Sequence, residues 1–125
     1  MKKIIIVDDN RNFREVIRAV VKNHFPECII MEFTEATQVV NELSNIGDDF
    51  DILLLDGDLG FGGHGSDVLQ ILTQDQIKKT ITCSGNDTFI QECKEKGILN
   101  SIDKGFEEIR ISKIGDYVLE IFKKV

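Results

Sequence analysis

The sequence predicts a doubly wound α/β domain, in which a parallel sheet is covered by helices on both faces. Apolar runs of strand length alternate along the 125-residue chain with amphipathic stretches of helix length, a pattern typical of consecutive βαβ units. The run Ile-Leu-Leu-Leu at 52–55 is apolar on both faces and therefore predicts a central strand. With 42% hydrophobic residues, the chain can bury the core of one ordinary domain, which we expect to span residues 1–125.

Five strands and five helices are expected in alternation. The strands are expected at 3–7, 28–33, 51–55, 79–83 and 100–103. The helices are expected at 10–23, 34–46, 66–72, 86–97 and 109–122. Their ends carry the usual signals: Pro26 breaks the first helix, Gly47 ends the second, Ser66 or Asp67 can cap the third, and Asn86 or its neighbour can cap the fourth.

Charge and hydropathy exclude several classes of partner. The net charge of −7 disfavours nucleic acid, because phosphate backbones need a positive surface. No apolar stretch approaches the roughly 18 residues of a membrane span, and the short apolar run after the basic N-terminus is too short for a signal peptide. We therefore expect a cytoplasmic domain without membrane contact. Cys28, Cys83 and Cys93 lack metal-type spacing and are expected to be reduced.

Chemically active side chains follow four of the expected strands. Asp8 and Asp9 follow the first strand, Asp56 the third, Ser84 the fourth and Lys104 the fifth. Open parallel sheets bind ligands beyond the carboxyl ends of their strands, so these side chains should converge. Close carboxylates repel each other unless a cation such as Mg²⁺ lies between them. The sequence therefore predicts a metal-assisted phosphoryl-transfer site.

Each of these residues also has a plainer explanation. Asp56 can be a carboxylate nucleophile that forms an acyl phosphate, or it can cap a turn. Asp9 can bind metal, or it or Asn10 can cap the next helix. Ser84 can donate to a phosphoryl oxygen or simply occupy a turn. Lys104 can stabilise the transferred phosphoryl group as a point charge or be an ordinary exposed lysine.

A glycine-rich loop at 57–65 follows Asp56. Its glycines match no phosphate-binding fingerprint of fixed spacing, so they are more typical of a mobile loop. His64 lies in this loop and has the chemistry to bind metal or carry phosphate, but a lone loop histidine is usually solvated.

Taken in order, Asp8-Asp9, Asp56, Ser84 and Lys104 resemble the motif set of receiver domains of bacterial two-component response regulators. The resemblance covers the whole chain and implies a flavodoxin-like (βα)5 fold with strand order 2-1-3-4-5. It also implies Mg²⁺-dependent phosphorylation of Asp56 by a histidine kinase or histidine phosphotransfer protein. Phosphorylation would then switch binding to a downstream protein target.

The same resemblance implies a role for each site residue. Asp9 and Asp56 would ligate Mg²⁺ through their side chains, Asp58 through its backbone carbonyl, and Asp8 mainly through a metal-bound water. The phosphoryl oxygens would be bound by the residues after the fourth and fifth strands, Ser84 and Lys104. The domain would not be an enzyme in the ordinary sense, although it would assist its own phosphorylation and dephosphorylation.

Three positions depart from the pattern of these receivers. Gly60 stands where the loop after the acceptor usually carries proline, and this loop is one residue longer than usual. Gly105 replaces the proline that usually follows the lysine, so we expect a trans bond there, since a non-proline cis bond costs roughly 2.5–4 kcal/mol. Ser101 stands at the position of the switch aromatic. These departures bear on the conformational switch more than on phosphorylation.

Two alternatives stay open at this stage. The fold can serve as a protein-binding module that is not phosphorylated. The segment from Leu54 to Asp58 also resembles the DxD motif of haloacid-dehalogenase-type phosphatases, in which the first aspartate is the nucleophile and the second the general acid. In those enzymes, however, the motif lies near the start of a longer chain, and here it is central.

Overall fold

The computed structural model describes residues 2–103, 116, 119–120 and 123. Its centre is a five-stranded parallel sheet of order β2-β1-β3-β4-β5, which confirms the predicted order. The strands begin and end within one residue of the predicted bounds: β1 (Lys3–Val7), β2 (Ile29–Phe33), β3 (Ile52–Leu55), β4 (Thr80–Ser84) and β5 (Asn100–Asp103).

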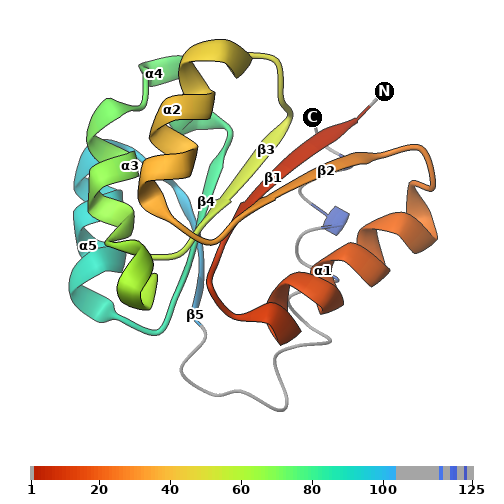
Figure 1. The fold of residues 1–125 in the computed structure, drawn as a ribbon, viewed down its shortest axis with the longest axis horizontal. Coiled ribbons are helices and arrows are strands. Elements are labelled where there is room, and N and C mark those ends of the chain that lie inside the picture. Colours follow the sequence, from red (N-terminus) through yellow and green to blue (C-terminus); the bar gives the residue numbers. More distant parts are fainter. Residues whose placement is uncertain (1, 104–115, 117–118, 121–122, 124–125) are drawn as a thin grey trace.

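Helices cover both faces of this sheet (Figure 1). Helix α1 (Arg11–His24) lies on one face, whereas α2 (Ala36–Ile46), α3 (Gly65–Ile71) and α5 (Asp87–Lys96) lie on the other. Alternate residues of the strands divide the core between the faces: Ile5 and Leu53 pack toward α2, α3 and α5, and Ile4 and Leu54 pack toward α1. This two-residue alternation explains why β3 is apolar throughout.

Two local predictions are corrected. Helix α3 is capped by His64, whose Nδ1 accepts the Ser66 N–H at 3.0 Å, and not by Ser66 or Asp67. A further helix, α4 (Gln74–Lys78), precedes β4 and was not predicted. It begins with a reciprocal capping box between Thr73 and Gln76, a signal that was readable in the sequence. Of the expected last helix (109–122), the structure describes only residues 116, 119 and 120, which are helical, and its apolar positions Ile109, Ile114, Val118, Ile121 and Phe122 lie outside the described residues.

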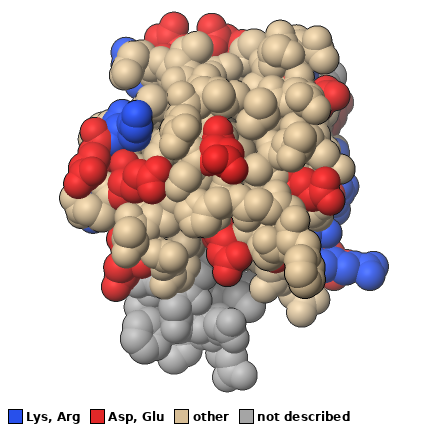
Figure 2. All heavy atoms as spheres, turned by 60° about the vertical axis from the view of Figure 1, so that its left-hand side comes forward, with Lys and Arg blue, Asp and Glu red and all other residues tan. Residues whose placement is uncertain are grey.

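Among the described residues, the face formed by α2, α3 and α5 carries no basic patch. Figure 2 shows acidic side chains scattered over this face, with basic side chains gathered toward its margins. The distribution agrees with the net charge of −7 and gives this face no positive surface for a phosphate backbone. Within the described part of the chain, no helix is both long and apolar enough to cross a membrane.

The three cysteines should react slowly with a thiol reagent in the native protein. All three are buried and free, and burial raises the pKa of the Cys93 thiol to about 11. Burial also raises the pKa of Cys28. At about pH 8 only roughly one Cys93 in a thousand is the reactive thiolate. We expect slow native labelling by Ellman's reagent and rapid labelling of all three thiols in guanidinium; rapid labelling without denaturant would contradict the packing.

Candidate functional site: an acidic cluster at the carboxyl edge

The backbone of the sheet positions two buried aspartates at its carboxyl edge. The Asp8 N–H donates to the Phe33 carbonyl at 3.0 Å, and the Asp56 N–H donates to the Val7 carbonyl at 3.0 Å. The sheet hydrogen bonding therefore continues one residue beyond β1 and β3. The side chains of Asp8 and Asp56 are only 1% and 6% exposed, respectively, so both are held by their surroundings.

Asp9 joins these two carboxyl groups. One carboxylate oxygen from each of Asp8, Asp9 and Asp56 lies within 4.8 Å of the others. A turn makes this possible: Asp8 Oδ1 accepts the Asn10 N–H at 2.8 Å, and Asn10 Oδ1 accepts the Phe13 N–H at 3.1 Å. Asn10, and not Asp9, therefore caps α1. The predicted convergence of the first and third strand ends is confirmed.

The cluster suits a hard divalent cation. At about 4 Å, two like charges repel by about 4 kcal/mol at an effective dielectric constant near 20. Carboxylate oxygens are the ligands that Mg²⁺ and Mn²⁺ accept, at about 2.0–2.2 Å for Mg²⁺, so oxygens on one ion lie up to about 4.2 Å apart. The observed separation of up to 4.8 Å needs only a small side-chain adjustment. The residues therefore fit a bound metal.

The side chain of Asp58 points into its own loop. It is exposed, and its Oδ1 accepts the Gly60 N–H at 2.9 Å. Asp58 also pairs with His64 in an isolated antiparallel bridge. Its carboxylate is not a member of the acidic cluster. This arrangement is compatible with the expectation that Asp58 would contribute only its backbone carbonyl to a metal.

Ser84 lies at the end of β4, at the same edge of the sheet as the cluster. It is buried, and its Oγ accepts the Asn86 N–H at 3.0 Å, so it does occupy a turn. A hydroxyl that accepts one hydrogen bond still has its proton to donate. Asn86 in turn caps α5. Lys104 lies outside the described residues; the described strand ends at Asp103, the register partner of Ser84.

Close packing at two glycines fixes the loop after Asp56. A Cβ on Gly65 would lie 2.2 Å from the Asp56 carbonyl oxygen, and a Cβ on Gly57 would lie 2.5 Å from the Phe89 ring. The Gly65 N–H donates to the Gly57 carbonyl at 2.8 Å, and Leu59 between them is buried. The glycines were interpreted as the mark of a mobile loop. The structure gives a different reason for them, since only glycine fits where the backbone passes this close.

The structure also explains one departure from the receiver pattern. Gly60 has φ +57°, which proline cannot adopt because its ring holds φ near −65°. The longer loop therefore takes a path on which the usual proline does not fit. Ser101, which stands at the expected position of the switch aromatic, is half-buried in β5 beside Thr82. The bond between Lys104 and Gly105 lies outside the described residues.

The structural roles of two residues, His64 and Arg14, were not predicted from the sequence. His64 caps α3 and packs edge-on against Phe89, with ring centroids 5.4 Å apart. Arg14 donates from Nη1 to the Asp8 carbonyl at 2.9 Å, while its Nε lies 3.3 Å from Glu32. No signal in the sequence indicated the contacts of Arg14, because Glu32 lies in β2, far from Arg14 along the chain, and only the fold brings the two residues together.

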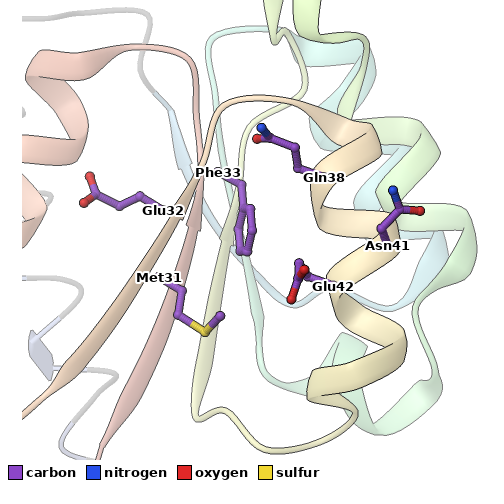
Figure 3. A pocket seen from close by; sticks show the side chains of 6 residues that line it. All are labelled: Met31, Glu32, Phe33, Gln38, Asn41 and Glu42. Carbon is purple, nitrogen blue, oxygen red and sulfur yellow. The ribbon is translucent and has the colours of Figure 1, made fainter.

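The structure also has a surface hollow apart from this cluster. It has a volume of about 640 Å³ and lies between β2 and α2 (Figure 3). Its side chains are a mixture of apolar and polar groups: Met31, Glu32, Phe33, Gln38, Asn41 and Glu42. None of them belongs to the acidic cluster.

The comparisons with known proteins agree with this geometry. Two solved structures resemble the chain over almost its whole length. One is the phosphorylated cyanobacterial phytochrome response regulator RcpA, with 19% identity, TM-score 0.81, and coverage of 97% of this chain and 93% of that one. The other is a response regulator receiver domain from Rhodospirillum rubrum, with 20% identity, TM-score 0.79, and coverage of 98% and 94%.

A third similar structure holds a metal. It is the Mn²⁺-bound form of response regulator Rcp1, with 14% identity, TM-score 0.77, and coverage of 94% of this chain and 91% of that one. A search of curated protein sequences found no match. The sequence profile of the response regulator receiver domain matches residues 4–115, which is most of the chain. The chain therefore belongs to the response regulator receiver domain family.

Proposed function

We propose that this domain accepts a phosphoryl group on Asp56 in a Mg²⁺-dependent reaction and thereby switches its binding to a protein target. The observation that carries the proposal is the cluster of Asp8, Asp9 and Asp56, with oxygens within 4.8 Å, at the carboxyl edge of a receiver fold. The donor would be a histidine kinase or a histidine phosphotransfer protein. Asp56 is the favoured acceptor because it follows the central strand β3 and is held rigidly.

The transfer would proceed by attack of an Asp56 carboxylate oxygen on phosphorus. The new O–P bond makes an acyl phosphate, and the P–N bond to the donor imidazole breaks, leaving its electron pair on the nitrogen. One oxygen of Asp56 accepts the Gly57 N–H at 2.8 Å, which orients the carboxylate. Ser84 and Lys104 would bind the phosphoryl oxygens.

A divalent cation would be held by this chain through the side chains of Asp9 and Asp56 and the backbone carbonyl of Asp58, with Asp8 acting mainly through water. The chemistry that Mg²⁺ supplies when bound is positive charge beside the phosphoryl oxygens. Three similar receivers support this assignment by analogy. RcpA was solved phosphorylated and Rcp1 with Mn²⁺, and the DrrB receiver domain was solved activated by BeF3.

The switch would begin at Ser84. Its Oγ accepts the N–H of Asn86, and Asn86 caps α5, so movement of this hydroxyl toward a new dianion would disturb the start of α5. Helix α5 is also tied to α3, because Ser66 Oγ donates to Glu92 at 3.0 Å. A change at Ser84 therefore has a continuous path to the surface of α5, where a target would sense it.

Incubation with acetyl phosphate and Mg²⁺ should add one phosphoryl group to the wild-type protein. The addition should be absent in Asp56→Asn, which keeps the shape of the acceptor but cannot form an acyl phosphate. It should also be absent in wild type treated with EDTA, because the repulsion of the cluster then opposes an anionic donor. Intact-protein mass spectrometry measures all three.

The same experiment separates the alternatives. A wild-type protein that stays unmodified with any donor would overturn the proposal and favour a binding module that is not phosphorylated. Labelling that persists in Asp56→Asn would place the acceptor elsewhere. Membership of the receiver family disfavours the phosphatase alternative. Steady turnover of a phosphate ester that collapses in Asp58→Ala would restore it.

A further inference from the structure

Among the residues that the structure describes, Phe61 stands out as an exposed aromatic side chain at the polar carboxyl edge. Phe61 lies in the short 3-10 turn η1 (Gly60–Gly62) and is fully exposed, at 113% of its reference area. Among the described residues the other exposed large hydrophobic side chains are Ile29, Ile71 and Leu99, and of these only Leu99 is exposed to a similar degree. An exposed phenyl ring leaves much of its 150–250 Å² of apolar area in water.

The backbone beneath this ring is fixed. Gly60 and Gly63 on either side have φ of +57° and +96°. A Cβ on Gly62 would lie 2.5 Å from the Thr34 carbonyl oxygen, so the turn packs directly against the loop before α2. The Gly62 N–H donates to the carbonyl of Leu59, which is itself buried. The ring is therefore presented outward by an anchored turn, which reduces the conformational entropy lost when a partner covers it.

The turn begins against the acidic cluster. A Cβ on Gly60 would lie 3.1 Å from Asp9 Oδ2, and the Cα of Phe61 follows that of Gly60 by about 3.8 Å. Leu99, by contrast, immediately precedes β5 and so lies at the amino edge of the sheet, away from the cluster. A protein that delivers a phosphoryl group to Asp56 must cover the carboxyl edge and will meet the ring.

The surroundings of the ring are polar and acidic. Asp9, Asp58, His64 and Asn86 are all exposed and follow the carboxyl ends of β1, β3 and β4, on the same edge of the sheet as the ring. One aromatic group within a polar rim is the arrangement of an interface hot spot, in which a central ring fills a pocket and the rim excludes water. The complementary surface is an apolar hollow with basic or neutral polar groups around it.

We propose that Phe61 is the docking anchor for the phosphohistidine-bearing protein that phosphorylates Asp56. The ring enters an apolar hollow beside the donor's histidine and sets the approach of the phosphoryl group. This inference rests on the proposed function, since it assumes that Asp56 is phosphorylated. The inference adds a surface that would recognise a protein donor. A small donor such as acetyl phosphate does not need this surface.

The test compares two donors on matched variants. Autophosphorylated histidine kinases and phosphorylated histidine phosphotransfer proteins are purified, and the rate at which each phosphorylates the wild-type domain is measured. The fastest donor is then used with Phe61→Ala and Leu99→Ala. For Phe61→Ala we expect kcat/KM with the protein donor to fall at least about tenfold, as for an interface hot spot. Acetyl phosphate should label all three proteins at similar rates. Leu99→Ala removes a comparably exposed side chain at the opposite edge and should match wild type with both donors.

Other outcomes are distinguishable. Equal protein-donor rates for Phe61→Ala and wild type would overturn the docking role, as would an equal loss with both donors, which would indicate a disturbed site. Labelling of wild type by acetyl phosphate but by no protein donor would overturn the inference and leave the acceptor intact. Failure with acetyl phosphate as well would overturn the proposed function itself.

A fluorescent variant gives a second readout. The chain has no tryptophan, so Phe61→Trp introduces a single reporter at this position. Its emission should shift to the blue when the selected donor protein is added, because the indole leaves water. A donor that transfers phosphate without shifting the emission would overturn the docking role. A shift that depends on the concentration of the receiver alone would instead identify a second copy of the chain as the occupant.

Discussion

Asp9→Asn should weaken Mg²⁺ binding by about a hundredfold or more, because it removes the charge of one of the two carboxylates, Asp9 and Asp56, that would ligate the ion directly. In the absence of metal the same change should leave the fold at least as stable as wild type. It relieves repulsion among carboxylates within 4.8 Å, and Asp9 is exposed, so its substitution disturbs no core packing. Isothermal titration calorimetry measures the affinity, and thermal unfolding with and without Mg²⁺ measures the two stabilities.

Asp58→Asn is the matched control. It makes the same change of charge nearby, but the amide oxygen can still accept the Gly60 N–H and the backbone carbonyl is retained. Its Mg²⁺ affinity should stay within about threefold of wild type, since only a screened surface charge is lost. Wild type at a hundred times its dissociation constant should gain about 2.7 kcal/mol from the metal. An equal loss of affinity in both variants would contradict the assignment of Asp9 as a side-chain ligand.

Gly65→Ala should have the largest effect on stability. The added methyl would lie 2.2 Å from the Asp56 carbonyl oxygen and 2.9 Å from the Phe89 ring, and the first contact is with backbone. Overpacking of this kind costs about 1–3 kcal/mol, and the upper end or beyond is expected where backbone must move. The movement displaces Asp56, so the folded fraction should also lose phosphorylation. Urea unfolding followed by circular dichroism measures the first effect, and labelling by acetyl phosphate measures the second.

Gly47→Ala measures the cost of backbone strain alone, without the steric clash that Gly65→Ala introduces. Gly47 has φ +59° and ends α2, but a Cβ there would meet nothing within 4 Å. Its cost should be only the backbone strain of an alanine at φ +59° and ψ −125°, a region that L residues rarely adopt, which is about 1–3 kcal/mol, and phosphorylation should be unaffected. If the two variants lose equal stability and Gly65→Ala keeps full labelling, the close approach of Gly65 to Asp56 is not what the loop requires.

The sequence predicts this fold well because its main signals are local. Each strand is a short apolar run, and the alternation of strands with amphipathic helices restricts the topology to a few parallel arrangements. The convergence of Asp8, Asp9 and Asp56 follows from that topology alone, since parallel strands end at one edge. Helix α4 was missed although the capping box of Thr73 and Gln76 is also local, because a pentapeptide helix is too short to show a period.

Other features depend on contacts that no local pattern encodes. Serine and aspartate are far commoner caps than histidine, so the sequence favoured Ser66 or Asp67 over His64. The contact of Arg14 with the Asp8 carbonyl depends on where α1 crosses the sheet. The outward position of Phe61 depends on the positive φ of Gly60 and Gly63 on either side of it, and glycine adopts either sign of φ freely. The amino-acid sequence alone therefore does not say which sign of φ each glycine adopts.

The ion pairs between α1 and Glu32 have a consequence for how folded copies of the protein associate. Strand β2 lies at one end of the sheet and leaves one row of backbone groups unpaired by any other described strand. Glu32 places a carboxylate in this five-residue strand, and Arg14 and Arg18 both bind it. A short strand with a fixed charge is a poor template for a foreign strand, so the exposed edge is protected against aggregation.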